Sequence, residues 1–203
     1  MKLLYLNEHL SCLNYQMNPD MGFAYHQLKK DDMYQINNSK SSCSLFMIEG
    51  EVCVNSGEYE GLRIMQGQMI FIPQNVEIRM QSTMESKCIL LFWDRNVSVC
   101  DKLFLGSLPV SDKDMEADDL ILPIRKNLMK VLDSIGTYLE AGLLCKHMHL
   151  LKQQEILLVL KGFYTKKELA AFFSTSTSIR QHFEKFVLEN YKKVNSVKEF
   201  ADL

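Results

Sequence analysis

The sequence predicts an α+β protein in which an antiparallel β-barrel or jelly roll is followed by a bundle of helices. Three observations carry this prediction. Residues 43–94 read as successive short strands that are separated by glycine and proline. Residues 123–173 place apolar side chains at helical spacing. The polar stretch 106–119 between the two regions lacks periodicity, which marks it as a connector.

The expected strands are bounded by residues that turn or stop a chain, chiefly Gly50, Gly67 and Pro73. Apolar and polar side chains alternate over residues 76–81, so we expect this strand to have one buried face and one face that is more exposed to solvent. Less regular strands are expected before residue 40. In chain order, the expected strands cover residues 22–28, 33–36, 43–49, 51–55, 62–65, 69–72, 76–81 and 88–93.

The strand Cys88–Trp93 differs from the others because both of its faces are apolar. One face has to be covered by the core of the barrel. The other requires a second cover, which is either the protein's own helices or a second subunit. Both alternatives stay open at this point.

Three helices are expected after the connector. Pro123 suits the first turn of a long helix with one apolar stripe, formed by Ile124, Leu128, Leu132, Ile135, Leu139 and Leu143. A second helix, over residues 147–163, is apolar nearly all round in its second half, so we expect it to be the buried one. Thr165 and Glu168 form a capping box that starts a short third helix.

The composition indicates a soluble, cytoplasmic protein. The chain has 203 residues and a formal net charge of −2, which gives no overall attraction to nucleic acid. Its six cysteines show no metal-ligand spacing and sit mostly among apolar neighbours, as reduced thiols do. The apolar start is interrupted at residues 7–9, too early for a signal peptide. No stretch approaches the roughly 20 apolar residues that cross a bilayer.

The histidines are few and scattered. His147 and His149 form the one His-x-His pattern, but they fall in an expected helix, where residues two apart point about 200° from each other. We therefore expect roles in packing or on the helix surface, and no shared metal ion. His26 is isolated in the sequence. No motif for a nucleophile, a phosphate loop or a Cys-x-x-Cys site occurs, so no catalytic residue is expected.

Two glycine patterns in the strand region match a known family. Five residues separate Gly67 from Pro73, Asn75 follows where a glycine is usual, and Gly50 closes an earlier strand. Asparagine tolerates the left-handed backbone that such a glycine adopts. The region resembles the two motifs of the cupin family, and the resemblance implies a cupin-like barrel over residues 1–105.

The same resemblance implies that the family's metal ligands are missing. Ile78 stands at the histidine of the second motif, Cys43 at the glutamate of the first, and residues 36–39 at its His-x-His. We therefore expect neither a metal nor another cofactor. A small cupin enzyme, such as a sugar isomerase or a dioxygenase, is the alternative interpretation.

The last residues of the chain carry the most specific pattern. Apolar residues recur at helical spacing from Phe183 to Tyr191, and Ser196 with Glu199 forms a capping box that starts another helix. The pattern Phe-x-x-Phe-Val-x-x-Asn-Tyr-x-Lys-Val, followed by Val-x-Glu-Phe-Ala, resembles the beginning of the DNA-binding domain of AraC-type bacterial transcription regulators. Residues 179–203 would form the start of this helix-turn-helix domain, without the helix that reads bases.

The resemblance implies a domain order and a function. A sensing domain over residues 1–105 and the linker 106–119 would precede a helical linker and dimerisation bundle over 120–178. The chain would sense a small effector and form a homodimer, and promoter DNA would be bound by the missing C-terminal part. A stand-alone interaction protein with similar helices is a third possibility.

Two sets of candidate residues follow from this hypothesis. Arg79 could pair with a carboxylate or hydroxyls of an effector, and Trp93 could stack on its apolar face. The competing interpretation is a solvated Arg79 and a Trp93 in the core. The stripe of Leu128, Leu132, Ile135 and Leu139 is either internal core or the surface that pairs two subunits.

Overall fold

The computed structural model describes residues 21–36, 38–56, 60–93 and 120–173, with the short pieces 4–5, 7–8, 13–15 and 107–108. Its strands are β1 (Gly22–Leu28), β2 (Met33–Ile36), β3 (Cys43–Glu49), β4 (Glu51–Ser56), β5 (Leu62–Met65), β6 (Gln68–Ile72), β7 (Ile78–Ser82), β8 (Ser86–Phe92) and β9 (Leu122–Pro123). They form a five-stranded sheet with the order β1-β8-β3-β6-β9 and a four-stranded sheet with the order β2-β7-β4-β5.

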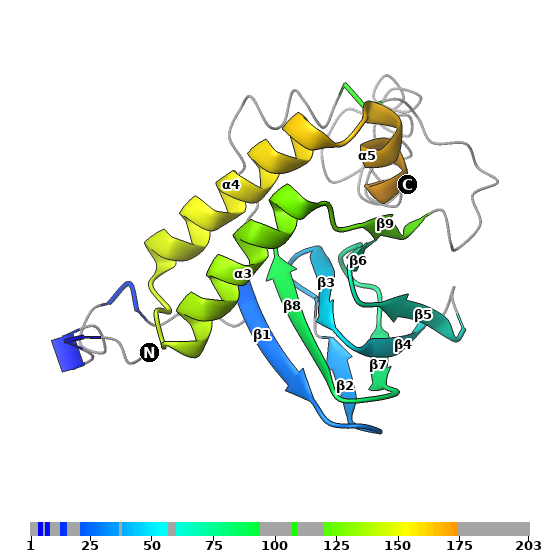
Figure 1. Cartoon of the computed structure of the whole chain (residues 1–203), viewed down its shortest axis with the longest axis horizontal. Helices are drawn as coiled ribbons and strands as arrows, with labels where there is room; N and C mark the ends of the chain where they lie inside the picture. Colours follow the sequence, from blue (N-terminus) through cyan, green and yellow to red (C-terminus); the bar gives the residue numbers. More distant parts are fainter. Residues whose placement is uncertain are drawn as a thin grey trace, which may run out of the picture.

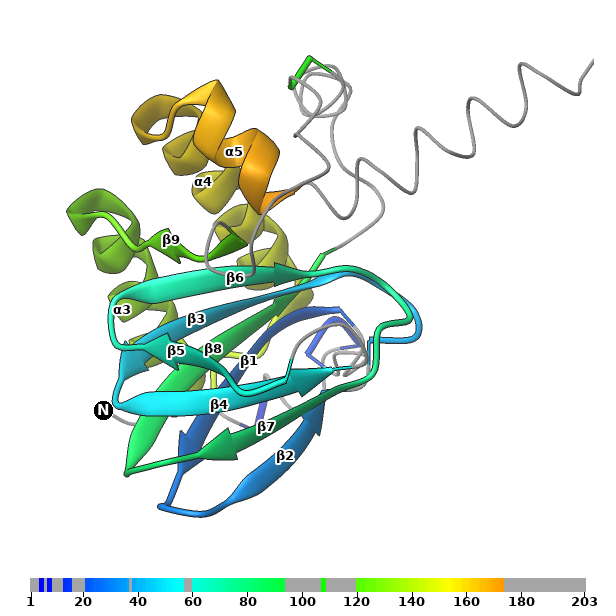
Figure 2. The same ribbon diagram turned by 90° about the vertical axis from the view of Figure 1, so that its right-hand side faces the viewer.

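The strand order is that of a jelly roll. The chain passes repeatedly from one sheet to the other, so that β1, β3, β6 and β8 face β2, β4, β5 and β7 (Figure 2). Two Greek keys of eight antiparallel strands produce this arrangement. The expected α+β class with antiparallel strands is confirmed. Among the described strands every ladder stays within one sheet, so a closed barrel is not shown.

An inner core fills the space between the sheets. Because successive side chains of a strand point to opposite faces, Cys88, Leu90 and Phe92 of β8 face inward, whereas Ile89 and Leu91 face outward. The inner core is formed by Leu28, Ile36, Cys43, Leu45, Met47, Val52, Val54, Leu62, Ile64, Ile70, Ile72, Ile78, Met80, Cys88, Leu90 and Phe92.

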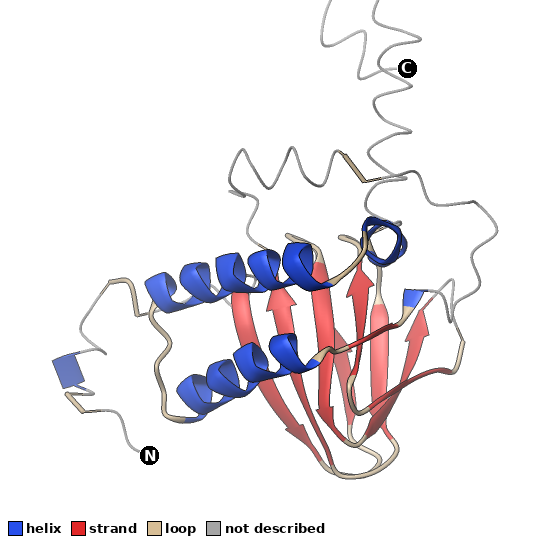
Figure 3. Cartoon of the chain, turned by 45° about the horizontal axis from the view of Figure 1, so that its top comes forward, coloured by secondary structure: helices blue, strands red, loops and turns tan. Residues whose placement is uncertain are grey.

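Helices cover the outer face of the five-stranded sheet. They are α3 (Lys126–Glu140), α4 (Lys146–Phe163) and α5 (Lys166–Phe172). Helices α3 and α4 lie side by side across the sheet (Figures 1 and 3). Together with the outer face of β8 and with Trp93 they bury a second apolar cluster, the outer core. The protein's own helices therefore cover the doubly apolar strand, which is the first of the two alternatives.

The long helix differs from its expected limits at both ends. Pro123 lies in the edge strand β9, opposite Gln68, and not in the first helical turn. An edge strand tolerates proline because a missing N–H breaks no interior ladder. The helix ends at Glu140 because Gly142 adopts a φ of 85° and the Leu143 amide donates to the Tyr138 carbonyl, which completes a Schellman turn.

The expected capping box at the start of the third helix is confirmed. The Thr165 hydroxyl accepts the Glu168 amide at 3.2 Å, and the Glu168 carboxylate accepts the Thr165 amide at 2.7 Å. At the other end of α5, Phe172 meets the ring of Phe71 on β6 with a centroid distance of 5.9 Å. This contact holds α5 against the sheet.

Two turns confirm the expected backbone. Asn75 has a φ of 64°, which is the left-handed conformation that the sequence indicates at this position. Gly50 has a φ of 79°, and a Cβ atom there would lie 2.5 Å from the carbonyl oxygen of Glu85. Only glycine fits this close approach of the β3–β4 and β7–β8 turns.

Several expected segments lie outside the described residues. They include the connector 106–119, apart from Ser107 and Leu108, and the whole of the segment 179–203 that resembles a DNA-binding domain. Among the helices that the structure describes, none combines the length and the apolar character that a bilayer crossing requires.

Candidate functional site

Three of the positions that correspond to cupin ligands lie in the inner core, whereas Ser39, at the end of the stretch 36–39, is exposed. Ile36, Cys43 and Ile78 are all buried among apolar side chains. Burial raises the pKa of the Cys43 thiol, so its sulfur stays protonated at neutral pH. Asn38 donates its side-chain amide to the carbonyl oxygen of Pro73 at 2.5 Å, and thus holds a turn. At Ile36, Cys43 and Ile78, aliphatic side chains and a protonated thiol offer no ligand to a metal ion.

A polar corner, formed by His26 and Tyr34, lies at the edge of the inner core. His26 belongs to β1 and Tyr34 to β2, which are edge strands of the two sheets. Their rings meet with a centroid distance of 4.3 Å and a tilt of 49°. In the β1–β8 ladder, His26 lies opposite Cys88. The alternation of Ala24, His26 and Leu28 is the sequence signal that places this histidine inward.

The chemistry of this corner is that of neutral groups. Burial lowers the pKa of His26 and raises the pKa of Cys88 to about 12. The Nε2 atom of His26 has no hydrogen-bond partner among the described residues. No three His, Cys, Asp or Glu side chains in the described part of the chain are placed to share a metal ion.

Arg79 lies on the outer surface of the four-stranded sheet. Its neighbours Ile78 and Met80 point into the inner core, so Arg79 points to solvent. Its guanidinium pairs with the Glu77 carboxylate at 3.1 Å, and both side chains are exposed. The pair borders an open depression of about 530 Å³, lined by Met33, Asn55, Ser56, Glu60, Glu77, Arg79, Met80 and Gln81. An ion pair this exposed adds little to stability.

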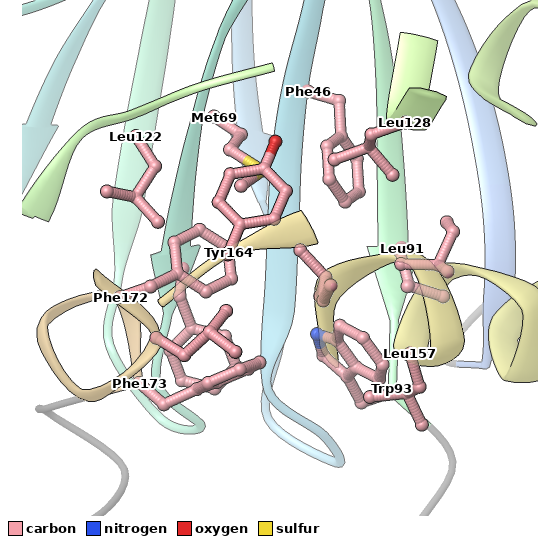
Figure 4. Packing of buried hydrophobic residues seen from close by; sticks show 14 of the residues in the cluster. Phe46, Met69, Leu91, Trp93, Leu122, Leu128, Leu157, Tyr164, Phe172 and Phe173 are labelled. Carbon is pink, nitrogen blue, oxygen red and sulfur yellow. The ribbon is translucent and has the colours of Figure 1, made fainter. Parts of the chain in front are cut away.

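Trp93 lies in the outer core beneath the helices (Figure 4). Its Nε1 donates to the Ser44 hydroxyl at 2.9 Å, and its ring meets Phe173 edge-on at 6.2 Å between centroids. The structure thus places Trp93 and Arg79 on different surfaces, separated by both sheets. One effector cannot contact both side chains, and the interpretation of Trp93 as core agrees with its burial.

The apolar stripe of α3 faces the sheet. Leu128, Leu132 and Ile135 are fully buried in the outer core, and Leu139 is partly buried against it. The structure therefore corrects the assignment of this stripe to a subunit interface. The physical reason is the outward face of β8, whose Ile89 and Leu91 need an apolar cover within the same chain.

Helix α4 is less buried than its composition predicts. Leu157 and Leu160 pack into the outer core, but Leu151 and Leu158 are 66% and 67% exposed. The prediction that this is the buried helix is wrong for its outer face. A helix that lies on a sheet can bury only one side, and the described residues place no further layer on α4.

The two histidines of α4 have different surroundings, as expected for helical neighbours two apart. His147 is exposed. His149 is buried, and its Nδ1 accepts the Phe23 amide at 3.0 Å. Burial lowers the pKa of His149 to about 4. This histidine anchors α4 to the start of β1.

Comparisons with known proteins give weak similarities. No family model and no curated protein matches the chain. A conserved Streptococcus pyogenes protein of unknown function is 15% identical, with a TM-score of 0.36, over 40% of this chain and 70% of that one. A cupin-2 domain protein from Shewanella frigidimarina is 16% identical, with a TM-score of 0.31, over 43% of this chain and 91% of that one. A mutant Bacillus subtilis oxalate decarboxylase is 18% identical, with a TM-score of 0.31, over 41% of this chain and 26% of that one.

Proposed function

We propose that this chain is the sensing and dimerisation part of a DNA-binding transcription regulator of the AraC type. The observation that carries the proposal is the sequence of residues 183–203, which resembles the start of the DNA-binding domain of that family. In such a regulator the helix that reads bases follows this segment and supplies the contacts to promoter DNA.

The fold of the described residues is compatible with this assignment. Cupins are jelly rolls, and the strand order observed here is that of a jelly roll. Helices α3 and α4 follow the sheets in the chain, where the resemblance places a linker and dimerisation bundle. Strand order is shared by many unrelated proteins, so it supports the cupin-like domain and does not identify the function.

The proposal treats the chain as a protein without enzymatic activity. Support comes from the residues at the ligand positions of the cupin motifs, since Ile36, Cys43 and Ile78 bring no ionised group to the inner core. Elemental analysis of protein purified without chelators tests this part. Stoichiometric iron, zinc or manganese would favour the cupin enzyme.

An effector site can be sought at Arg79, since its guanidinium is exposed beside a surface depression. Trp93 is covered by Phe173 and the helices, and we do not place it in that site. A panel of metabolites, screened by shifts in melting temperature, tests for an effector because a ligand of the folded state raises the midpoint. Arg79→Ala should abolish the shift given by an anionic ligand, whereas the exposed Arg63→Ala should preserve it.

A reporter experiment tests the regulatory part. The chain is fused to a foreign DNA-binding domain that occupies its operator only as a dimer. Repression of the reporter is expected, because two linked domains bind neighbouring half-sites at raised effective concentration. The DNA-binding domain alone is the control. A stable fusion that fails to repress would contradict dimerisation by this chain.

A further inference from the structure

The layer formed by α3, α4 and α5 carries a positive charge that the sheets do not share. Residues 120–173 contain eight lysines or arginines and four acidic residues, whereas residues 21–93 contain six and eight. The helical layer is therefore basic in a chain whose formal net charge is −2. A charge asymmetry of this kind indicates a surface that meets a polyanion.

Two of the four acidic side chains of this layer are neutralised within the layer itself. The Glu155 carboxylate lies 2.7 Å from the ammonium of Lys152, and the Glu168 carboxylate lies 2.6 Å from the guanidinium of Arg125. These two carboxylates are thus occupied. Other lysines of the helical layer keep their charge available to a partner.

Three exposed lysines, Lys126, Lys166 and Lys167, lie where α3 and α5 begin. The ion pair of Arg125 and Glu168 holds the two helix starts together, and each of its members directly adjoins one of these lysines in the chain. Within the described parts of the chain, no carboxylate pairs with any of the three. We refer to Lys126, Lys166 and Lys167 as the junction lysines.

The start of α3 adds to the positive potential of this surface. Its first turn contains no acidic residue, so the free amide ends of the helix reinforce the charge of Lys126. A cation at this end of a helix gains nothing from the helix dipole. The position of Lys126 therefore favours an anionic partner outside the described residues.

The junction lysines lie close to the point where the chain leaves the helical layer. Helix α5 has seven residues, so its end is about 10 Å from its start. From Phe173, the next residue after α5, an extended chain reaches residue 179 within about 22 Å. A DNA-binding domain that begins at residue 179 is therefore tethered near the junction lysines.

We propose that the junction lysines contact the phosphate backbone of the DNA that the following domain binds. The proposal rests on the regulatory function proposed above and adds a contact from the helical layer. A duplex carries one negative charge per about 1.7 Å of its axis, so three ammonium groups meet phosphates at any sequence. Such contacts add affinity and orientation, whereas base edges are read elsewhere.

The apolar residues of α5 favour DNA over a lipid surface. A helix that binds a membrane surface needs exposed apolar side chains beside its cations. Leu169, Ala170 and Phe172 of α5 are all buried in the outer core. The junction lysines of α5 therefore have no apolar face next to them that could enter a bilayer.

Binding of the whole chain to a labelled duplex of arbitrary sequence, measured by fluorescence anisotropy between about 25 and 200 mM NaCl, tests the proposal. The wild type is expected to bind weakly, with an affinity that falls steeply as salt rises. The triple variant Lys126→Gln, Lys166→Gln, Lys167→Gln should bind at least about tenfold more weakly at the lowest salt. It should also reduce the slope of log K against log salt by about 2–3, since each phosphate contact contributes about 0.9.

The matched control is the triple variant Lys29→Gln, Lys30→Gln, Arg63→Gln. It removes the same charge from exposed positions in the β1–β2 turn and on β5. Its affinity should stay within about twofold of the wild type. The basic residues of the segment 179–203 are the same in all three proteins, so their contribution cancels in the comparison. Circular dichroism verifies that both variants are folded.

The possible outcomes separate this contact from the proposed function. Equal weakening by the control would overturn the contact, since net charge would then explain the effect. An unchanged salt slope in the junction variant would overturn it as well, as would a wild type that does not bind the duplex. In each case the proposed function keeps its own test, because the foreign domain of the reporter fusion binds its operator without the junction lysines.

Vesicles of phosphatidylglycerol provide a second probe, with binding measured by cosedimentation. The junction variant is expected to differ from the wild type on the duplex and to match it on vesicles. A variant that loses binding to vesicles and keeps binding to the duplex would assign this surface to lipid and overturn the contact with DNA.

Discussion

The hydroxyl of Tyr164 donates to the carbonyl oxygen of Pro123 at 2.9 Å, although the residues are 41 positions apart. The same oxygen atom of Tyr164 accepts the backbone amide of Arg125 at 2.8 Å, and the Arg125 guanidinium lies 4.6 Å from the centre of its ring. Tyr164 is 6% exposed, so water cannot readily replace these bonds. The tyrosine therefore ties the end of α4 to the strand that leads into α3.

Removal of this hydroxyl should destabilise the protein. Tyr164→Phe leaves the Arg125 amide and the Pro123 carbonyl without their partner, and we expect a loss of about 1–3 kcal/mol in the free energy of unfolding. Urea unfolding followed by Trp93 fluorescence measures it. Tyr138→Phe, at an exposed position of α3, should change stability by less than about 0.5 kcal/mol. Equal effects of the two variants would show that the link is not important.

Gly50→Ala should be more harmful than Gly61→Ala. Both glycines have a positive φ, 79° and 70°, so both variants incur the left-handed cost of roughly 1–2 kcal/mol. At Gly50 the new methyl group also meets the backbone at Glu85, whereas at Gly61 nothing lies within 4 Å. A further loss of roughly 1–3 kcal/mol is expected from this overlap. Similar melting temperatures for the two variants would contradict the close approach of the two turns.

The α3 stripe should behave as core. Leu132→Ala removes a fully buried side chain beneath the helix, and a loss of about 2–5 kcal/mol is expected. Leu158→Ala, on the exposed face of α4, should cost less than about 0.5 kcal/mol. Chemical unfolding at submicromolar protein concentration is suitable, because the proposed contact between copies would then be dissociated. A mild effect of Leu132→Ala would reopen its assignment to a subunit interface.

Stability should fall in mild acid because of His149. Its pKa is lowered from 6.5 to about 4, so between these values the unfolded chain binds more protons than the folded one. The contribution is complete above pH 6.5 and is lost as the pH falls towards 4, with a slope of at most about 1.4 kcal/mol per pH unit. Unfolding experiments at pH 7, 6 and 5 measure the slope.

Substitution should identify the histidine responsible. His149→Gln cannot be protonated, yet its amide oxygen can still accept from Phe23, so the slope between pH 7 and 5 should decrease. His147→Gln is the control, since this side chain is exposed on the same helix. His26 also has a lowered pKa and accounts for a residual slope of the same sign. An unchanged slope in His149→Gln would contradict the buried, neutral state of this histidine.

The sequence by itself determined the local structure of this protein. Alternation of side chains predicts the strands, the Thr165–Glu168 pair predicts the start of α5, and Asn75 predicts a left-handed turn. Comparison with the cupin motifs also predicts which residues occupy the ligand positions. These signals depend on neighbours a few residues apart, which is why they can be read before the chain is folded.

Only the tertiary structure decided which surfaces are covered. Pro123 joins a strand because β6 offers a free edge, and the α3 stripe becomes core because β8 is apolar on its outer face. The same packing leaves Leu151 and Leu158 of α4 exposed and separates Arg79 from Trp93 by two sheets. His26 and Tyr34 meet because the edges of the two sheets meet. Such contacts depend on strand pairing between segments far apart in the chain, and no local pattern specifies that pairing.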